Sequence, residues 1–303
     1  MKTIKRLSMV LLPLIIILLA FSGCKSDDYY YADGSVDISK MLLSMTAKSA
    51  KDLGLPEQPD SIEDVPGGNI DVALLGDWRS ANLRWGYFQH FTFTSDGEFD
   101  MNQAGLPDVY FGGKFTCMIA SGSKIICCEY QERDSESYYE YLTYTVKNGA
   151  LYMAPLEKSD NGTEYSTRVL CLYKVDEDWD NSEAVANNPV SISSLYGEWE
   201  LDGVTVKIDS DGLKVGDSTF KVYLSNNAKL VVEKDGSSSE YLYYLYYSKT
   251  YTDESRTEVT GENMSLQLYY LKDGENDEPN LLKEIPGWEY DWGIYDITLS
   301  RPL

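Results

Sequence analysis

From residue 70 onward, apolar and polar residues alternate in short runs that are rich in aromatic and β-branched residues. A period of two predicts half-buried β-strands. The runs include FTFT, TYTV, LYMA, TFKVYL, KLVVE and SLQLYYL, and between them stand SDG, SGS, KNG, SDNG and KDG. The Gly, Asn and Asp residues of these turns tolerate the positive φ that hairpins need. The pattern therefore predicts an up-and-down antiparallel sheet.

Two segments of this region carry the same landmarks in the same order. The first begins with LLGDW at Leu74–Trp78 and closes with RVLCLYKV, and the second begins with LYGEW at Leu195–Trp199 and closes with YDITLSRP. This agreement indicates an internal duplication, with modules at residues 70–175 and 192–303. A sheet of this size removes its exposed edges by closing, so we expect an all-β protein with two tandem barrels.

The landmarks also resemble a known superfamily. A Leu-x-Gly-x-Trp start, an Asp-Gly turn and a closing strand with a basic residue are similar to the lipocalin-like domains of bacterial lipoproteins. There the first-strand tryptophan plugs one end of the barrel, and an Arg or Lys of the last strand lies across it. The resemblance implies that Trp78 meets Lys174 and that Trp199 meets Arg301. Such a cation contributes ~0.5–2 kcal/mol over an indole face.

The chain begins like an exported protein. After three basic residues, an apolar stretch runs from Leu7 to Phe21 and is interrupted by Pro13. It is short for a membrane span, which needs roughly 20 apolar residues, and suits a signal peptide over residues 1–23. The FSGC sequence resembles the lipobox of bacterial lipoproteins, although Phe21 stands where Leu is usual. The resemblance implies lipid on Cys24 and a place on the membrane, facing outside the cytoplasm. An ordinary secretory signal is the alternative.

Two segments are expected to lie outside the modules, one before the first module and one between the two. Residues 24–69 would form a tether that includes a short amphipathic helix over residues 37–53, capped by Asp37 and ended by Gly54. A proline-rich linker would follow this helix. The acidic segment 176–191 would join the modules, and its length leaves their relative orientation open.

Charge and cysteine content restrict the partners. The chain has 49 acidic and 26 basic residues, and removal of the signal peptide lowers the formal charge from −23 to −26. This charge disfavours nucleic acid and anionic headgroups as partners. The cysteines after Cys24 show no CxxC pair, and His90 is the single histidine. We therefore expect no metal and no cofactor.

The strand pairing of one hairpin, around residue 122, can be predicted residue by residue. If Gly122 and Ser123 form its turn, Cys117 faces Cys128 across the strands, and both lie on an apolar inner face with Phe115. The two thiols are then either buried and free or joined in a cross-strand disulfide.

Catalysis finds little support in the sequence. His90 should point outward from its strand, and no Gly-rich loop joins a strand to a helix. The suggestive feature is YLYYLYY, because one face of that strand must look outward. The possible aromatic surface comprises Tyr241, Tyr243, Tyr244, Tyr246 and Tyr247.

We therefore expect a non-catalytic, lipid-anchored surface protein whose two barrels bind a small apolar ligand or a protein partner. The alternative is a structural or envelope-sensing module with dry barrels. A wall hydrolase that works through carboxylates is the least favoured reading.

Overall fold

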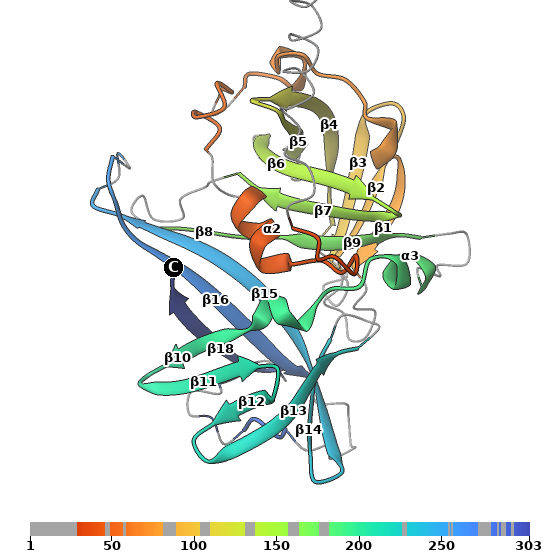
Figure 1. The fold of residues 1–303 in the computed structure, drawn as a ribbon. Coiled ribbons are helices and arrows are strands. Elements are labelled where there is room, and N and C mark those ends of the chain that lie inside the picture. Colours follow the sequence, from red (N-terminus) through yellow and green to blue (C-terminus); the bar gives the residue numbers. More distant parts are fainter. Residues whose placement is uncertain are drawn as a thin grey trace, which may run out of the picture.

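The computed structural model confirms the all-β prediction, because two closed eight-stranded antiparallel barrels make up most of the chain (Figure 1). No helix in the part that is described has the length and apolar character needed to cross a membrane. The structure describes residues 29–45, 49–56, 59–80, 89–103, 110–130, 137–156, 164–175, 182–225, 229–253, 255, 257–271, 280–283, 285, 289–291 and 294–303. The predicted signal peptide and Cys24 lie outside these residues.

Barrel 1 follows the chain from strand to strand, and its last strand returns to pair with its first. Its interior is filled mainly by aromatic and aliphatic side chains, among them Phe93, Phe99 and Phe115. The strands are β1 (Gly76–Ser80), β2 (Gln89–Phe93), β3 (Glu98–Gln103), β4 (Tyr110–Ala120), β5 (Ser123–Tyr130), β6 (Tyr138–Lys147), β7 (Ala150–Pro155) and β9 (Leu170–Lys174).

Barrel 2 has the same up-and-down order and closes through the pairing of Glu200 with Ser300. Its strands are β10 (Gly197–Leu201), β11 (Val204–Asp209), β12 (Gly212–Val215), β13 (Ser218–Leu224), β14 (Leu230–Lys234), β15 (Ser237–Tyr251), β16 (Val259–Leu271) and β18 (Ile294–Pro302), and the short β17 (Glu289–Asp291) pairs with β18. The two long strands β15 and β16 extend past the rest of the barrel toward barrel 1 (Figure 1).

One strand of the first module pairs with a strand of the second barrel. β8 (Glu164–Arg168) pairs with the later part of β15, from Tyr246 to Thr250, on the edge that β14 occupies along the earlier part. After Val169 the same segment continues as β9 and closes barrel 1. The relative orientation of the barrels, which the sequence left open, is therefore set by backbone pairing between them.

A single apolar cluster joins the barrels. The outer face of β7 and β9, with Tyr152 and Tyr173, packs into the same cluster as Trp199 and the interior of barrel 2. Between the barrels lies α2 (Ile38–Met45), which buries Ile38, Met41 and Leu42 in this cluster (Figure 1). A short helix, α3 (Ser182–Asn187), precedes the second module.

The N-terminal helix is shorter than predicted. Asp37 caps it as expected, since its carboxylate accepts a hydrogen bond from the backbone N–H of Lys40 at 3.0 Å. However, the helix ends at Met45, and Leu53 packs in a different cluster. The prediction of one helix from 37 to 53 was wrong because its apolar residues serve two separate surfaces.

The proline-rich stretch that was predicted as a linker is packed against barrel 1. Leu53, Ile62 and Val65 cover the outer face of β4, β5 and β6, where they contact a cluster that includes Ile125 and Cys127. A one-turn 3-10 helix, η1 (Ile62–Asp64), lies in this stretch. These residues give barrel 1 a second apolar layer outside its interior.

The β4–β5 hairpin turns one residue earlier than predicted. Ser121 and Gly122 have φ of 49° and 82° and form the turn, so Cys117 pairs with Ile126, and Phe115 pairs with Cys128. The predicted pairing of Cys117 with Cys128 was wrong. A shift of two positions leaves every side chain on its own face, so the apolar pattern could not distinguish the two registers.

Candidate functional site

One end of each barrel is closed by a tryptophan. Trp78 and Trp199 are fully buried. Their indole N–H groups donate to the carbonyl oxygens of Leu74 at 2.6 Å and Leu195 at 3.0 Å. Each carbonyl belongs to a 3-10 helix just before the first strand, η2 (Val72–Leu74) and η3 (Ile192–Leu195). The two copies thus share one local structure.

A cation lies over each indole. The amine of Lys174 is 5.4 Å from the ring centre of Trp78, and the guanidinium of Arg301 is 4.2 Å from that of Trp199. These are the pairs that the family resemblance implied. Lys174 also donates to the carbonyl of Leu75 at 3.0 Å. Each pair caps the end of a buried core.

The tryptophan end of barrel 2 is covered by the rest of the molecule. Ser39 of α2 lies 3.4 Å from Arg301 and 3.7 Å from the sulfur of Met264, at hydrogen-bonding positions. The apolar residues of α2 pack against the same cluster as Trp199. A ligand that enters barrel 2 must therefore come from the opposite end.

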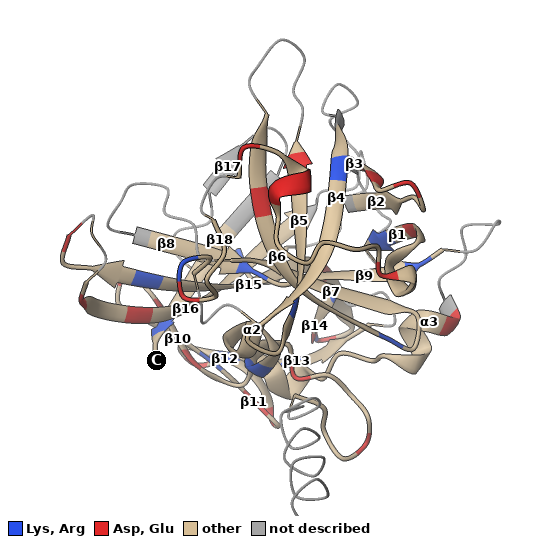
Figure 2. Cartoon of the chain, turned by 90° about the horizontal axis from the view of Figure 1, so that it is seen from above, with Lys and Arg blue, Asp and Glu red and all other residues tan. Residues whose placement is uncertain are grey.

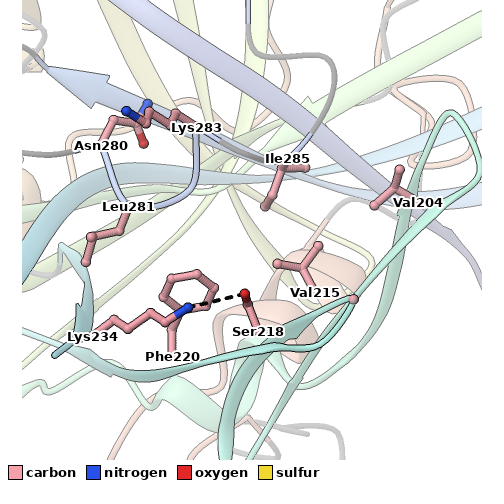
Figure 3. Close-up of a pocket in the computed structure, with 10 residues that line it drawn as sticks. Val204, Val215, Ser218, Phe220, Lys234, Asn280, Leu281, Lys283 and Ile285 are labelled. Carbon is pink, nitrogen blue, oxygen red and sulfur yellow. Dashed lines mark hydrogen bonds between the residues drawn. The ribbon is translucent and has the colours of Figure 1, made fainter.

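That opposite end holds a pocket of ≈ 460 Å³ (Figure 3). The turns β10–β11, β12–β13 and β14–β15 meet there, which is why residues far apart in the sequence share the pocket wall. Most of the wall is apolar. It is lined by Val204, Val215, Gly216, Ser218, Phe220, Lys234, Asn280, Leu281, Lys283 and Ile285.

A short segment between β16 and β18 covers this end of the barrel. The backbone N–H groups of Leu281 and Leu282 donate to the hydroxyls of Ser239 and Tyr241, each at 3.1 Å. The Tyr241 hydroxyl in turn donates to the Asn280 side-chain oxygen at 2.8 Å. Leu282 is fully buried, so it fills the barrel below the pocket.

Lys234 is the charged group set deepest in the wall. Its ammonium donates to the hydroxyl of Ser218 at 3.2 Å and lies 4.9 Å from the ring centre of Phe220 (Figure 3). Lys234 is half-buried, whereas Lys283 is exposed. The arrangement offers one cation at the edge of an apolar surface, which is a means of holding an anion.

The tyrosine run of β15 is divided between two faces. Tyr241 and Tyr247 are buried inside barrel 2, and Tyr243 packs against the cluster that joins the barrels. Tyr244 and Tyr246 are half-buried on the other face, where the guanidinium of Arg168 lies 4.8 Å and 6.0 Å from their ring centres. The predicted aromatic surface is thus reduced to two rings, and an arginine of β8 already covers them.

The four cysteines of the first module are free thiols. For Cys117 and Cys128, this is one of the two alternatives left open by the sequence. Burial raises the pKa of Cys127 and of Cys171 to about 12, and it also raises the pKa of Cys117 and Cys128. A thiol with so high a pKa is protonated at neutral pH, so none of them is an activated nucleophile.

His90 lies on the outer face of barrel 1, beside Asp77. Its Nε2 is 3.5 Å from the Asp77 carboxylate, while burial, followed by the charge of Arg79, lowers its pKa. Acidic residues are spread over strands and turns of both barrels (Figure 2). Within the described residues, no group of three or more His, Cys, Asp or Glu side chains is arranged to hold a metal ion.

The chain matches no family model, no curated protein and no solved structure. Sequence reasoning did not single out Lys234 or the covering segment. The alternation in KLVVEKDG contained a usable signal, because Lys234 is in phase with the core residues Leu230 and Val232.

Proposed function

We propose that this protein is a non-catalytic, lipid-anchored binding protein outside the cytoplasm, and that its second lipocalin-like barrel takes up a small apolar ligand at its open end. The observation that carries the proposal is the ≈ 460 Å³ pocket opposite Trp199. Ligand sites in proteins span roughly 300–1,000 Å³ and combine apolar walls with a few polar groups. The wall of this pocket has that composition.

Binding of an environment-sensitive apolar dye to the full mature chain tests the pocket. Val215→Trp places a large ring in the pocket wall, so dye binding should weaken at least tenfold. Val259→Trp is the matched control, because Val259 lies on the same barrel but is 43% exposed and outside the pocket. Equal dye binding by all three proteins, or no binding by any, would favour the alternative of dry barrels that act through their surfaces.

Native mass spectrometry of the soluble part, purified from its own host, complements the dye assay. A co-purifying small molecule should be present in the unaltered protein and reduced in Val215→Trp. Recovery of the molecule at equal occupancy in both proteins would place the ligand elsewhere.

The absence of catalysis is also testable at this pocket. Ser218 and Lys234 lie 3.2 Å apart, which is within the reach that a serine nucleophile and its base require. The proposal expects no turnover of aryl esters with acyl chains of graded length. Hydrolysis that Ser218→Ala abolishes would make the barrel an esterase and overturn the non-catalytic assignment.

The anchor requires its own experiment. Cells that express the full chain should incorporate labelled fatty acid into the protein, and Cys24→Ser should lose the label. Lys25→Ala, at the next position, should keep it. Equal labelling of both variants, or none in the unaltered chain, would remove the membrane anchor from the proposal.

A further inference from the structure

We infer that the ligand of barrel 2 is an amphipathic anion, an apolar body with one negatively charged head group that pairs with Lys234. This inference rests on the proposed function and specifies the chemistry of its ligand. The inference follows from the direction of the Lys234 side chain, from its contacts, and from the carboxylate partners that, among the described residues, four other lysines of the barrel have and Lys234 lacks.

Lys234 points toward the interior. It stands two residues after Val232 and four after Leu230, both of which are fully buried in the core of barrel 2, and side chains alternate between the faces of a strand. Its two partners, Ser218 and Phe220, lie two residues apart on one face of the neighbouring β13 and also line the pocket. The ammonium is therefore part of the inner surface of the open end.

Four of the described lysines of this barrel have carboxylate partners. Lys221 is 2.8 Å from Glu233, Lys229 is 2.7 Å from Glu240, and two further lysines contact Asp209 at 3.1 Å and 3.4 Å. Within the described part of the chain, the contacts of Lys234 are a hydroxyl and a ring, and no carboxylate is among them.

This difference carries the inference because acidic residues outnumber basic residues by 49 to 26 in this chain. A half-buried ammonium is stabilised by an opposite charge. For the four lysines named above, neighbouring carboxylates supply it. The described wall around Lys234 contains no carboxylate, so we assign that role to a ligand.

The remaining wall describes the rest of the ligand. Besides Lys234, the wall contains the apolar side chains of Val204 and Val215 from the strands, and those of Leu281 and Ile285 from the covering segment (Figure 3). An unbranched or ring-shaped hydrocarbon body fits such walls, because it loses no hydration of polar groups when it is buried there.

Calorimetric titration with matched ligands tests the charge. Straight-chain alkyl carboxylates from hexanoate to hexadecanoate are compared with alcohols of the same lengths, on the full mature chain. For the chain length that binds best, the carboxylate should bind at least tenfold more tightly than the alcohol. Lys234→Met should remove this preference while leaving alcohol binding within twofold, and Lys234→Arg should restore most of it.

Lys221→Met is the matched control, since it removes a lysine from the outer surface of the same barrel. It should keep the preference for the carboxylate, and circular dichroism establishes that each variant is folded. Carboxylate and alcohol binding with equal affinity, unchanged in Lys234→Met, would overturn the inference but leave the apolar pocket. If no carboxylate or alcohol binds at any length, the proposed function itself is wrong.

Discussion

The two barrels end differently at the side away from their tryptophans. The fifth strand of barrel 1 finishes with the inward-facing Tyr130, and the fifth strand of barrel 2 finishes with the inward-facing Lys234. Tyr130 is buried, stacks on Tyr138 at 4.8 Å and meets Phe99 edge-to-face at 5.1 Å. Aromatic rings thus fill this end of barrel 1, whereas the same end of barrel 2 keeps a pocket.

The comparison shows that one duplicated scaffold has two kinds of interior. Both copies retain the tryptophan, the 3-10 helix and the cation at the closed end, since these hold the barrel together. The end opposite the tryptophan is not needed to hold the barrel together in this way. The side chains that occupy this end therefore differ between the two barrels. This difference makes barrel 2, rather than barrel 1, the place for the ligand in the proposed function.

Truncation of a ring should have the largest effect, and it should differ between the barrels. Phe99→Ala leaves a cavity in a filled core and should lower the free energy of unfolding by about 3–5 kcal/mol. Phe220→Ala enlarges a pocket that already exists. Its loss of unfolding free energy should therefore be about 2 kcal/mol smaller than the loss in Phe99→Ala. Urea denaturation measures both. Equal losses would mean that the two open ends are packed alike.

The cluster that joins the barrels should make them unfold together. Tyr165 of β8 is buried in this cluster, so Tyr165→Ala should lower stability by about 2–4 kcal/mol and split one thermal transition into two. Tyr165→Phe keeps the ring and should retain a single transition. Two transitions in the unaltered protein would show that the barrels are independent.

The glycines before the two tryptophans should respond unequally to substitution. At Gly197, φ is +150° and a methyl group would collide with the guanidinium of Arg301, while at Gly76, φ is +112° and the nearest atom of Lys174 is 3.4 Å away. We expect Gly197→Ala to lower the free energy of unfolding by about 2–3 kcal/mol and Gly76→Ala by about 1 kcal/mol, as measured by urea denaturation. A larger loss at Gly76 would contradict the tighter cap of barrel 2.

The smallest effect is expected from thiol labelling of the native protein. Because the pKa of Cys127 and of Cys171 is about 12, roughly one in ten thousand of these thiols is ionised at pH 8. The ionised fraction rises as the pH approaches the pKa. Iodoacetamide should therefore modify neither in the native state and both after unfolding, as read by mass spectrometry. Rapid native labelling of Cys171 alone would indicate that the barrels separate at the surface where it lies.

The candidate site could be predicted from the sequence only in part. The two tryptophan–cation pairs were implied by the resemblance to lipocalin-like domains, whose Leu-x-Gly-x-Trp start and closing basic residue occur in both modules. The pocket was not implied in this way, because its wall combines turns of three hairpins with a segment near residue 280. No local pattern records which distant segments meet.

By itself, the sequence determined the strand content, the two repeated modules and the apolar face of the hairpin that carries Phe115 and Cys128, because alternation with a period of two is a local property of the chain. The tertiary structure alone decided the register at Ser121, the packing of Leu53, Ile62 and Val65 on barrel 1 and the pairing of β8 with the other barrel. Each of these depends on which of several compatible surfaces packs against another. The surfaces that pack together are those that bury the most apolar area and satisfy the backbone hydrogen bonds of the whole molecule. A short stretch of sequence does not determine either quantity.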